Sequence, residues 1–375
     1  MSHAALLERL RERFPDGPYG PGVSLVARLN DAALNLSRDQ RVHVFIPDCH
    51  IVPPANVKAW EGAVCTSANL KALYRLMAAL SVVEADSDVV IWQLGDLFDF
   101  WRTGKILESA ETRRQALHSS CKTAWNAFAP EQVQRLVGNH DDPFEDSPDL
   151  LQLEYFIPPE PDLSADSDVL VLHGHQFDPI ERMAPRLKEF FMRGAMERVD
   201  KTARDMMSAA NPNWSRTPDP RSRRRRPNLT KSHRWEFLSF ELTASAPVPL
   251  DRQPYNVMPA APVWRLEGGG ALLGHGGEWV DAKYQQLYVK ARDRADEETA
   301  KGRDVSLIVI GHTHHARIIL GARSDGKPFA LMDCGAWVGT GFLSASMHRP
   351  IWNAQIGVKV GDDLRVYQLG YEIDA

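Results

Sequence analysis

The sequence has few cysteines, no long apolar run and no strong net charge. Its four cysteines form no C-x-x-C pair, which disfavours a disulfide framework and favours free thiols in a reducing cytoplasm. No stretch approaches the ~18 consecutive apolar residues of a membrane-spanning helix. Residues 4–14 mix Leu with Glu and Arg at helical spacing, unlike the uncharged centre of a signal peptide. We therefore expect a cytoplasmic protein without a transmembrane segment.

The bulk composition is that of an ordinary globular protein. A formal net charge of -5 argues against a chain that is basic throughout, although it leaves room for a local basic patch. A hydrophobic content of 43% in 375 residues is enough for a substantial core without disulfide support. This length fits one large domain or a core that carries an insertion.

Five predominantly apolar runs each end abruptly in a polar cluster. The runs are residues 42–46, 89–92, 133–137, 169–172 and 305–310. The clusters after them are, in order, Asp48-Cys49-His50, Gly95-Asp96-Leu97-Phe98-Asp99, Gly138-Asn139-His140-Asp141, His173-Gly174-His175 and Gly311-His312-Thr313-His314. Short β-branched runs of this kind predict buried strands. Because ligands bind beyond the carboxyl ends of strands in α/β sheets, one pocket can receive all five clusters.

The segments between the first strands have helical periodicity. Residues 68–83 and about 108–128 are the clearest examples, so strands and helices alternate. Such alternation predicts an α/β fold with a parallel or mixed sheet covered by helices. Residues 329–332 and 364–369 are expected to add the last strands of the core.

The pattern changes after His175. Residues 180–209 have helical spacing, residues 247–277 are rich in Pro and Gly, and residues 281–300 again predict a helix. We therefore expect a catalytic core formed by residues 1–179 and 305–375. The intervening residues 180–304 would be a large, partly helical insertion that acts as a cap or lid.

The polar clusters supply a mixed set of oxygen and nitrogen ligands. The candidates are Asp48, His50, Asp96, Asn139, His173, His312 and His314. One tetrahedral zinc site needs only four ligands, so the set suits two metals that share a carboxylate. Asp96 is the central candidate for the shared ligand. Imidazole with carboxylate suits Zn, Fe or Mn, and such metal pairs assist displacement at phosphorus.

The ordered set of five clusters resembles the calcineurin-like metallophosphoesterases. The resemblance spans roughly residues 40–340 and leaves the insertion outside. It implies a four-layer αββα sandwich, two sheets between helices, with a binuclear centre at the strand ends. It also implies two divalent or mixed-valence transition-metal ions and direct attack on phosphorus by a metal-bound hydroxide.

The same resemblance assigns roles to individual residues. Carried over by motif, Asp48, His50 and His314 would hold one metal. Asn139, His173 and His312 would hold the other, and Asp96 would bridge the two. His140 would face the leaving group, and Asp99 would orient His140.

The G-D-L-F-D-F-W form of the second cluster is similar to the branch that contains UDP-2,3-diacylglucosamine pyrophosphatases. The run Asp333-Cys334-Gly335-Ala336-Trp337 is similar to that branch as well. The chain departs from it in carrying His140 where the branch usually has Arg, and in its longer insertion. Phe100-Trp101 replaces the Arg-Gly that is usual in protein serine/threonine phosphatases, which disfavours a protein substrate.

Three functions follow from these residues. The leading expectation is a phosphohydrolase that acts on a phosphorylated small molecule or a nucleotide-like substrate. A nuclease or phosphodiesterase acting on nucleic acid is the first alternative, because residues 214–234 hold eight basic residues and one acidic residue. The other interpretation of that run is a solvated loop without a binding role. A scaffold without catalysis is the remaining alternative, which the complete ligand set disfavours.

Overall fold

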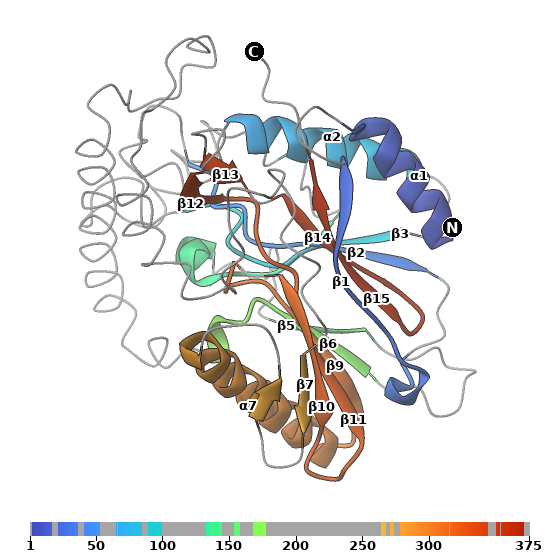
Figure 1. The fold of residues 1–375 in the computed structure, drawn as a ribbon, viewed down its shortest axis with the longest axis vertical. Coiled ribbons are helices and arrows are strands. Elements are labelled where there is room, and N and C mark those ends of the chain that lie inside the picture. The colour runs from blue at the N-terminus through green and yellow to red at the C-terminus, as the bar shows by residue number, and fades with distance from the viewer. Residues whose placement is uncertain are drawn as a thin grey trace, which may run out of the picture.

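The computed structural model describes sixteen stretches of the chain (Figure 1). They are residues 2–16, 22–36, 41–52, 65, 67–84, 89–99, 126, 133–144, 154–157, 168–177, 264–267, 271–273, 278–314, 316–343, 350–352 and 354–370. These residues form two large β-sheets and three long helices, which Figure 1 shows in layers.

The first sheet has six strands in the order β1-β15-β14-β2-β3-β4. Their bounds are β1 (Val23–Asn30), β2 (Val42–Ile46), β3 (Val89–Gln93), β4 (Gln134–Arg135), β14 (Gln355–Val360) and β15 (Asp363–Leu369). Strands β2, β3 and β4 run parallel, whereas β14, β15 and β1 join through antiparallel pairs. Three strands therefore deliver their carboxyl ends to one edge of this sheet.

The second sheet has seven strands in the order β5-β6-β9-β11-β10-β7-β8. Their bounds are β5 (Glu154–Ile157), β6 (Asp168–Leu172), β7 (Trp264–Glu267), β8 (Ala271–Leu273), β9 (Val305–Ile310), β10 (Arg317–Ala322) and β11 (Pro328–Asp333). Strands β6, β9 and β11 are parallel neighbours. A separate two-stranded ribbon pairs β12 (Gly339–Leu343) with β13 (Pro350–Trp352).

Alternating side chains place each sheet between two apolar layers. Val44 of β2 packs in the cluster that includes the first two helices, whereas its neighbour Phe45 points into the cluster between the sheets. Likewise, Val309 of β9 faces the first sheet and Ile308 faces the opposite side. Strands buried on both faces are apolar at most positions, which explains the nearly continuous runs in the sequence.

Helices cover the outer faces of both sheets. Helices α1 (His3–Arg13) and α2 (Ser67–Glu84) contribute Leu10 and Leu76 to the cluster on the first sheet. Helix α7 (Glu278–Ala300) packs Tyr288 against strands of the second sheet. The order is therefore helix, sheet, sheet, helix, and the predicted four-layer α/β fold is confirmed (Figure 1).

Part of the predicted insertion belongs to these layers. Strands β7 and β8 extend the second sheet through the parallel pair of β7 with β10, and α7 covers that sheet. A segment after residue 264 thus contributes to the core, because its apolar side chains bury the outer face of β9 and β11. The division at residues 179 and 305 stays a prediction, since residues 178–263, including the basic run 214–234, lie outside the described part.

The predicted helix at residues 108–128 also lies outside the described residues, except for Asn126. Short 3-10 turns complete the described elements. They are η1 (Ala32–Leu34), η5 (Asn139–Phe144) and η6 (His175–Phe177). Among the helices that the structure describes, none has both the length and the apolar character needed to cross a bilayer.

Candidate metal centre

The five polar clusters meet where strands of the two sheets end. The backbone N–H groups of Cys49 and His50 both donate to the carbonyl of Asp96, at 2.9 Å each. In the second sheet the N–H of Gly311 donates to the carbonyl of His173 at 3.0 Å. These bonds join the β2 loop to the β3 loop and the β6 loop to the β9 loop. The Asn139 cluster joins the β3 loop through the N–H of His140, which donates to Asp96 Oδ1 at 2.7 Å.

The backbone at this site is strained. Of the five non-glycine residues with positive φ in the described part of the chain, four are predicted ligands: His50, Asp96, His312 and His314. Left-handed backbone in such residues costs roughly 1–3 kcal/mol each and persists only where surrounding contacts fix it. Gly95, with φ +96°, allows the close approach expected from sequence, because a Cβ there would lie 2.7 Å from the Gly138 nitrogen.

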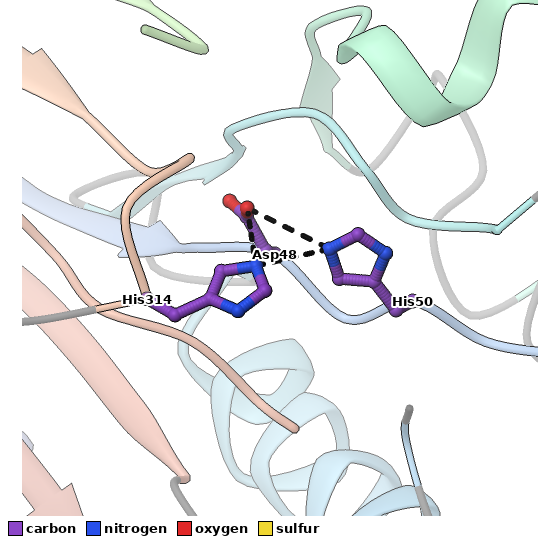
Figure 2. Close-up of side chains that lie close together, drawn as sticks. All are labelled: Asp48, His50 and His314. Carbon is purple, nitrogen blue, oxygen red and sulfur yellow. Dashed lines mark hydrogen bonds and ion pairs between the residues drawn. The ribbon is translucent and has the colours of Figure 1, made fainter. Parts of the chain in front are cut away.

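One group of side chains converges from both sheets. Figure 2 shows Asp48, His50 and His314 pointing toward one another. The Nε2 atoms of His50 and His314 lie 3.0 Å apart. Asp48 Oδ2 lies 3.1 Å from His314 Nε2 and 3.9 Å from His50 Nε2. Two imidazole nitrogens and one carboxylate oxygen therefore face a common point.

A second group adjoins the first. His173 Nε2 lies 3.3 Å from Asp96 Oδ2 and 3.1 Å from Asn139 Oδ1. The other ring nitrogen, Nδ1, lies 2.8 Å from the Leu94 carbonyl, which fixes the ring and leaves Nε2 for a ligand. The ring of His312 lies 5.1 Å from that of His173. All seven predicted ligands thus lie at this junction of the sheets.

Asp96 lies between the two groups. Its Oδ2 atom is 3.5 Å from His50 Nε2 and 3.3 Å from His173 Nε2. Its Oδ1 atom accepts a hydrogen bond from the backbone N–H of His140 at 2.7 Å. The carboxylate is thereby held with one oxygen toward both groups.

Burial and charge oppose each other at these residues. Burial by itself would raise the pKa of Asp96, but His173 and His140 outweigh it and hold that pKa well below its usual value. Burial would also lower the pKa of His173, yet Asp96 and Asp48 raise it to about 10. The buried carboxylates therefore demand positive charge. A metal cation meets the same demand and releases the histidine proton.

The donor set fits transition-metal ions. Bonds of 2.0–2.2 Å place neighbouring ligand atoms roughly 3.0–3.4 Å apart, close to most of the separations within both groups. The thiol of Cys49 is turned away, because its Sγ donates to the Pro47 carbonyl at 3.4 Å and burial raises its pKa well above the usual value. No group of candidate ligands in the described residues contains a cysteine.

Asp99 contacts two histidines at once. Its Oδ1 lies 3.1 Å from His140 Nδ1, and its Oδ2 lies 3.3 Å from His50 Nδ1. Burial lowers the pKa of His140, whereas Asp99 and Asp96 act in the opposite direction. His140 also lies within ligand range of His50 and Asp96, so geometry alone permits metal binding as well as proton transfer.

Several supporting residues were missed by sequence reasoning. Asp141 is buried and accepts backbone hydrogen bonds from Leu97, Phe98 and Gly138, at 3.3, 3.1 and 3.2 Å. Burial and Asp96 raise the pKa of Asp141 to about 8, against the effect of these donors. The only feature of the sequence that could have identified Asp141 was its place in the Gly-Asn-His-Asp cluster.

A second missed carboxylate lies at the end of β11. The hydroxyl of Thr313 donates a hydrogen bond to Asp333 Oδ2. Burial raises the pKa of Asp333 to about 8. The side chain of His175 is buried beside the rings of His173 and His312, at 5.3 and 6.4 Å. The only signal for these residues was their position within or next to the quoted motifs.

The sequence profile of calcineurin-like phosphoesterases matches residues 43–316, which include every predicted ligand. This protein belongs to the calcineurin-like phosphoesterase family. Family membership and the clustered Asp and His side chains support a hydrolase that cleaves phosphoesters with the help of metal ions.

Other comparisons add little to this assignment. A solved structure from Streptococcus pneumoniae TIGR4, described as a conserved uncharacterized protein and predicted phosphoesterase, is 8% identical to this chain. The alignment covers 89% of this chain and 94% of that one, with a TM-score of 0.30, too low to carry an argument. A search of curated proteins found no match.

Proposed function

We propose that this calcineurin-like phosphoesterase is a binuclear metallohydrolase for a phosphorylated small molecule or a nucleotide-like substrate. The observation that carries the proposal is the position of Asp96 Oδ2, 3.5 Å from His50 Nε2 and 3.3 Å from His173 Nε2. A carboxylate between two histidine-containing groups suits a ligand shared by two ions.

The proposed ligand sets follow the two groups. Asp48, His50 and His314 would hold one ion, and Asn139, His173 and His312 the other. Mn, Fe and Zn all suit these oxygen and nitrogen donors. When bound, such ions supply Lewis acidity at the phosphoryl oxygens and activate water for attack on phosphorus.

His140 is the proposed general acid for the leaving group. Its Nδ1 faces Asp99 at 3.1 Å, which holds the imidazole and leaves Nε2 as the atom that can reach a substrate oxygen. As the bond from phosphorus to the leaving oxygen breaks, Nε2 donates a proton to that oxygen. Asp99 stabilises the protonated ring before the transfer. Because Asp99 also contacts His50, it ties the acid to a proposed ligand.

The test combines metal analysis with a substrate series. The purified full chain should carry up to two equivalents of Mn, Fe or Zn and hydrolyse p-nitrophenyl phosphate, bis(p-nitrophenyl) phosphate or a nucleoside-diphosphate sugar. The preferred member of this series separates monoesterase, diesterase and pyrophosphatase activities. Two bound metals with no hydrolysis of any of the three would overturn the proposal. Absence of both metal and hydrolysis would favour a scaffold.

A nuclease is the second candidate, and the basic composition of residues 214–234 favours it. Binding to phosphate backbones through Lys and Arg weakens steeply as salt rises. Neutralising Arg223 to Arg226 should then raise KM for single-stranded DNA or RNA and flatten its salt dependence, with unchanged metal content. Equal kinetics across salt concentrations would assign the run to a solvated loop.

A further inference from the structure

The loop between β9 and β10 is the most strained part of the candidate metal centre. His312 and His314 have φ values of 66° and 62° on either side of Thr313. The N–H of Thr313 donates to the Gly311 carbonyl at 2.8 Å, a bond that closes a three-residue γ-turn around His312. A γ-turn with positive φ at its centre is rare and strained, so neighbouring contacts must stabilise this loop.

Asp333 supplies such a contact. The Thr313 hydroxyl donates to Asp333 Oδ2, and the N–H of Gly335 donates to Oδ1 at 3.1 Å. Asp333 is 1% exposed, and its strand partner across the sheet is Arg317. A buried carboxylate therefore holds the one side chain that lies between two proposed ligands.

The loop that follows Asp333 is anchored in the other sheet. The carboxamide oxygen of Gln355, in β14, accepts from the N–H of Ala336 at 3.3 Å. Trp337 is fully buried; its indole N–H donates to the Gln355 carbonyl at 2.7 Å, and its backbone N–H donates to the Asp48 carbonyl at 2.7 Å. A Cβ at Gly335, where φ is +84°, would lie 1.9 Å from that carboxamide oxygen. The backbone that follows Asp333 is thus held by contacts with both sheets.

We infer that Asp333 is a positioning residue for the metal centre and acts through Thr313. The carboxylate fixes the Thr313 side chain, and Thr313 in turn fixes the flanking backbone that presents His312 and His314. This inference rests on the proposed metal-dependent function, but its measurable consequence is metal affinity rather than turnover. Without this contact, the loop that carries His312 and His314 would relax toward ordinary φ values. Each metal-binding event would then have to restore the strained backbone, at a cost in binding free energy.

The test is a double-mutant cycle read out by Mn²⁺ binding. Isothermal titration calorimetry on the metal-free full chain would compare Thr313→Val, Asp333→Ala and the double variant. Each single change should weaken Mn²⁺ binding by roughly 10–100-fold, the usual effect of losing a partner behind the ligands. Since both changes break one link, the double variant should bind about as weakly as the weaker single variant.

Matched variants separate positioning from general stability. Thr299→Val removes a hydroxyl of α7 that donates to the Ala295 carbonyl and accepts from Arg323 Nη1, at 2.9 Å each. This site is remote in the fold from the polar clusters, so the change should leave Mn²⁺ affinity unchanged. Thr313→Ser and Asp333→Asn retain polar partners and should bind Mn²⁺ close to the level of the unaltered protein. They also keep the test informative if a truncated variant fails to fold.

Two outcomes would overturn the inference. One is unaltered Mn²⁺ affinity in Thr313→Val; the other is a double variant whose loss is the product of the single losses. Failure of the proposed function has a different signature, which is Mn²⁺ binding by the unaltered protein without phosphoester hydrolysis. Binding of none of Mn²⁺, Fe²⁺ and Zn²⁺ by the unaltered protein would contradict both.

Discussion

Asp141→Asn is a change of one atom that should destabilise the fold. Both carboxylate oxygens of Asp141 accept backbone hydrogen bonds: Oδ2 from Leu97 and Gly138, and Oδ1 from Phe98. Two of these donors belong to the loop of Asp96, and the third belongs to the loop of Asn139. A carboxamide has only one acceptor oxygen, so its NH₂ group must face at least one buried N–H.

The expected loss follows from these bonds. Above pH 8, where Asp141 is ionised, a buried N–H left without an acceptor costs about 1–3 kcal/mol, and loss of the negative charge weakens the remaining bonds by about 1 kcal/mol each. Relief of the cost of burying a charge beside Asp96 offsets part of this, leaving a net loss of about 2–4 kcal/mol. With an unfolding entropy of roughly 0.8 kcal/mol/K for 375 residues, Tm should fall by about 3–5 °C.

Differential scanning calorimetry in metal-free buffer above pH 8 would measure the change. Asp31→Asn is the matched control, because Asp31 Oδ1 also accepts a backbone N–H, from Ala33 at 3.0 Å, but does so at an exposed turn. The control should unfold close to the unaltered protein. If Asp141→Asn unfolds at the same temperature as the control, the two loops do not need both acceptor oxygens, and the reasoning is wrong.

Three further predictions concern the site and the N-terminal helix. Asp96→Ala should remove bound metal and hydrolysis together, which metal analysis checks; two occupied sites with normal turnover would reject its bridging role. His140→Ala should retain metal and lower kcat by roughly 10²–10⁴-fold, less for good leaving groups, with a smaller defect of the same kind in Asp99→Asn. Equal losses on all leaving groups, or lost metal, would contradict the acid role. Burial and Arg365 lower the pKa of His3 to about 4, so the unfolded chain binds its proton first and stability falls from about pH 6.5 toward pH 4. His3→Gln should flatten this slope in urea unfolding, and an unchanged slope would reject it.

Much of the fold was predictable because strands that are buried on both faces have short, mostly apolar sequences. The runs at residues 42–46 and 305–310 correspond to β2 and β9, since both faces of these strands are covered. Strand β1 (Val23–Asn30) was missed because an edge strand with exposed positions has no continuous apolar run. Strands β7 and β8 were not predicted within residues 247–277, because nothing local distinguishes a short strand that joins a distant sheet edge.

The candidate ligands of the site were predictable from residue type and position, but the residues that hold these ligands in place were not. Asp96 and His314 stand out because a polar residue directly after a buried strand is unusual. The link from Thr313 to Asp333 joins two loops that are separated by a β-hairpin, and its partners are common residues in common places. Left-handed φ at His50 was also invisible, because the sequence there gives no glycine to mark it.

The origin of the proposed ligands has a consequence for how the molecule responds to metal supply. Asp48 and Asp96 follow strands of one sheet, whereas His173 and His314 follow strands of the other. The ligands of an ion held by both sets come together only in the native state. At a free concentration 100 times its Kd, such an ion would therefore raise the unfolding free energy by about 2.7 kcal/mol. Chelation would then lower resistance to heat and proteolysis along with turnover. An inactivation curve recorded with a chelator therefore mixes loss of catalysis with loss of native protein, and the two separate only when unfolding is followed in the same sample.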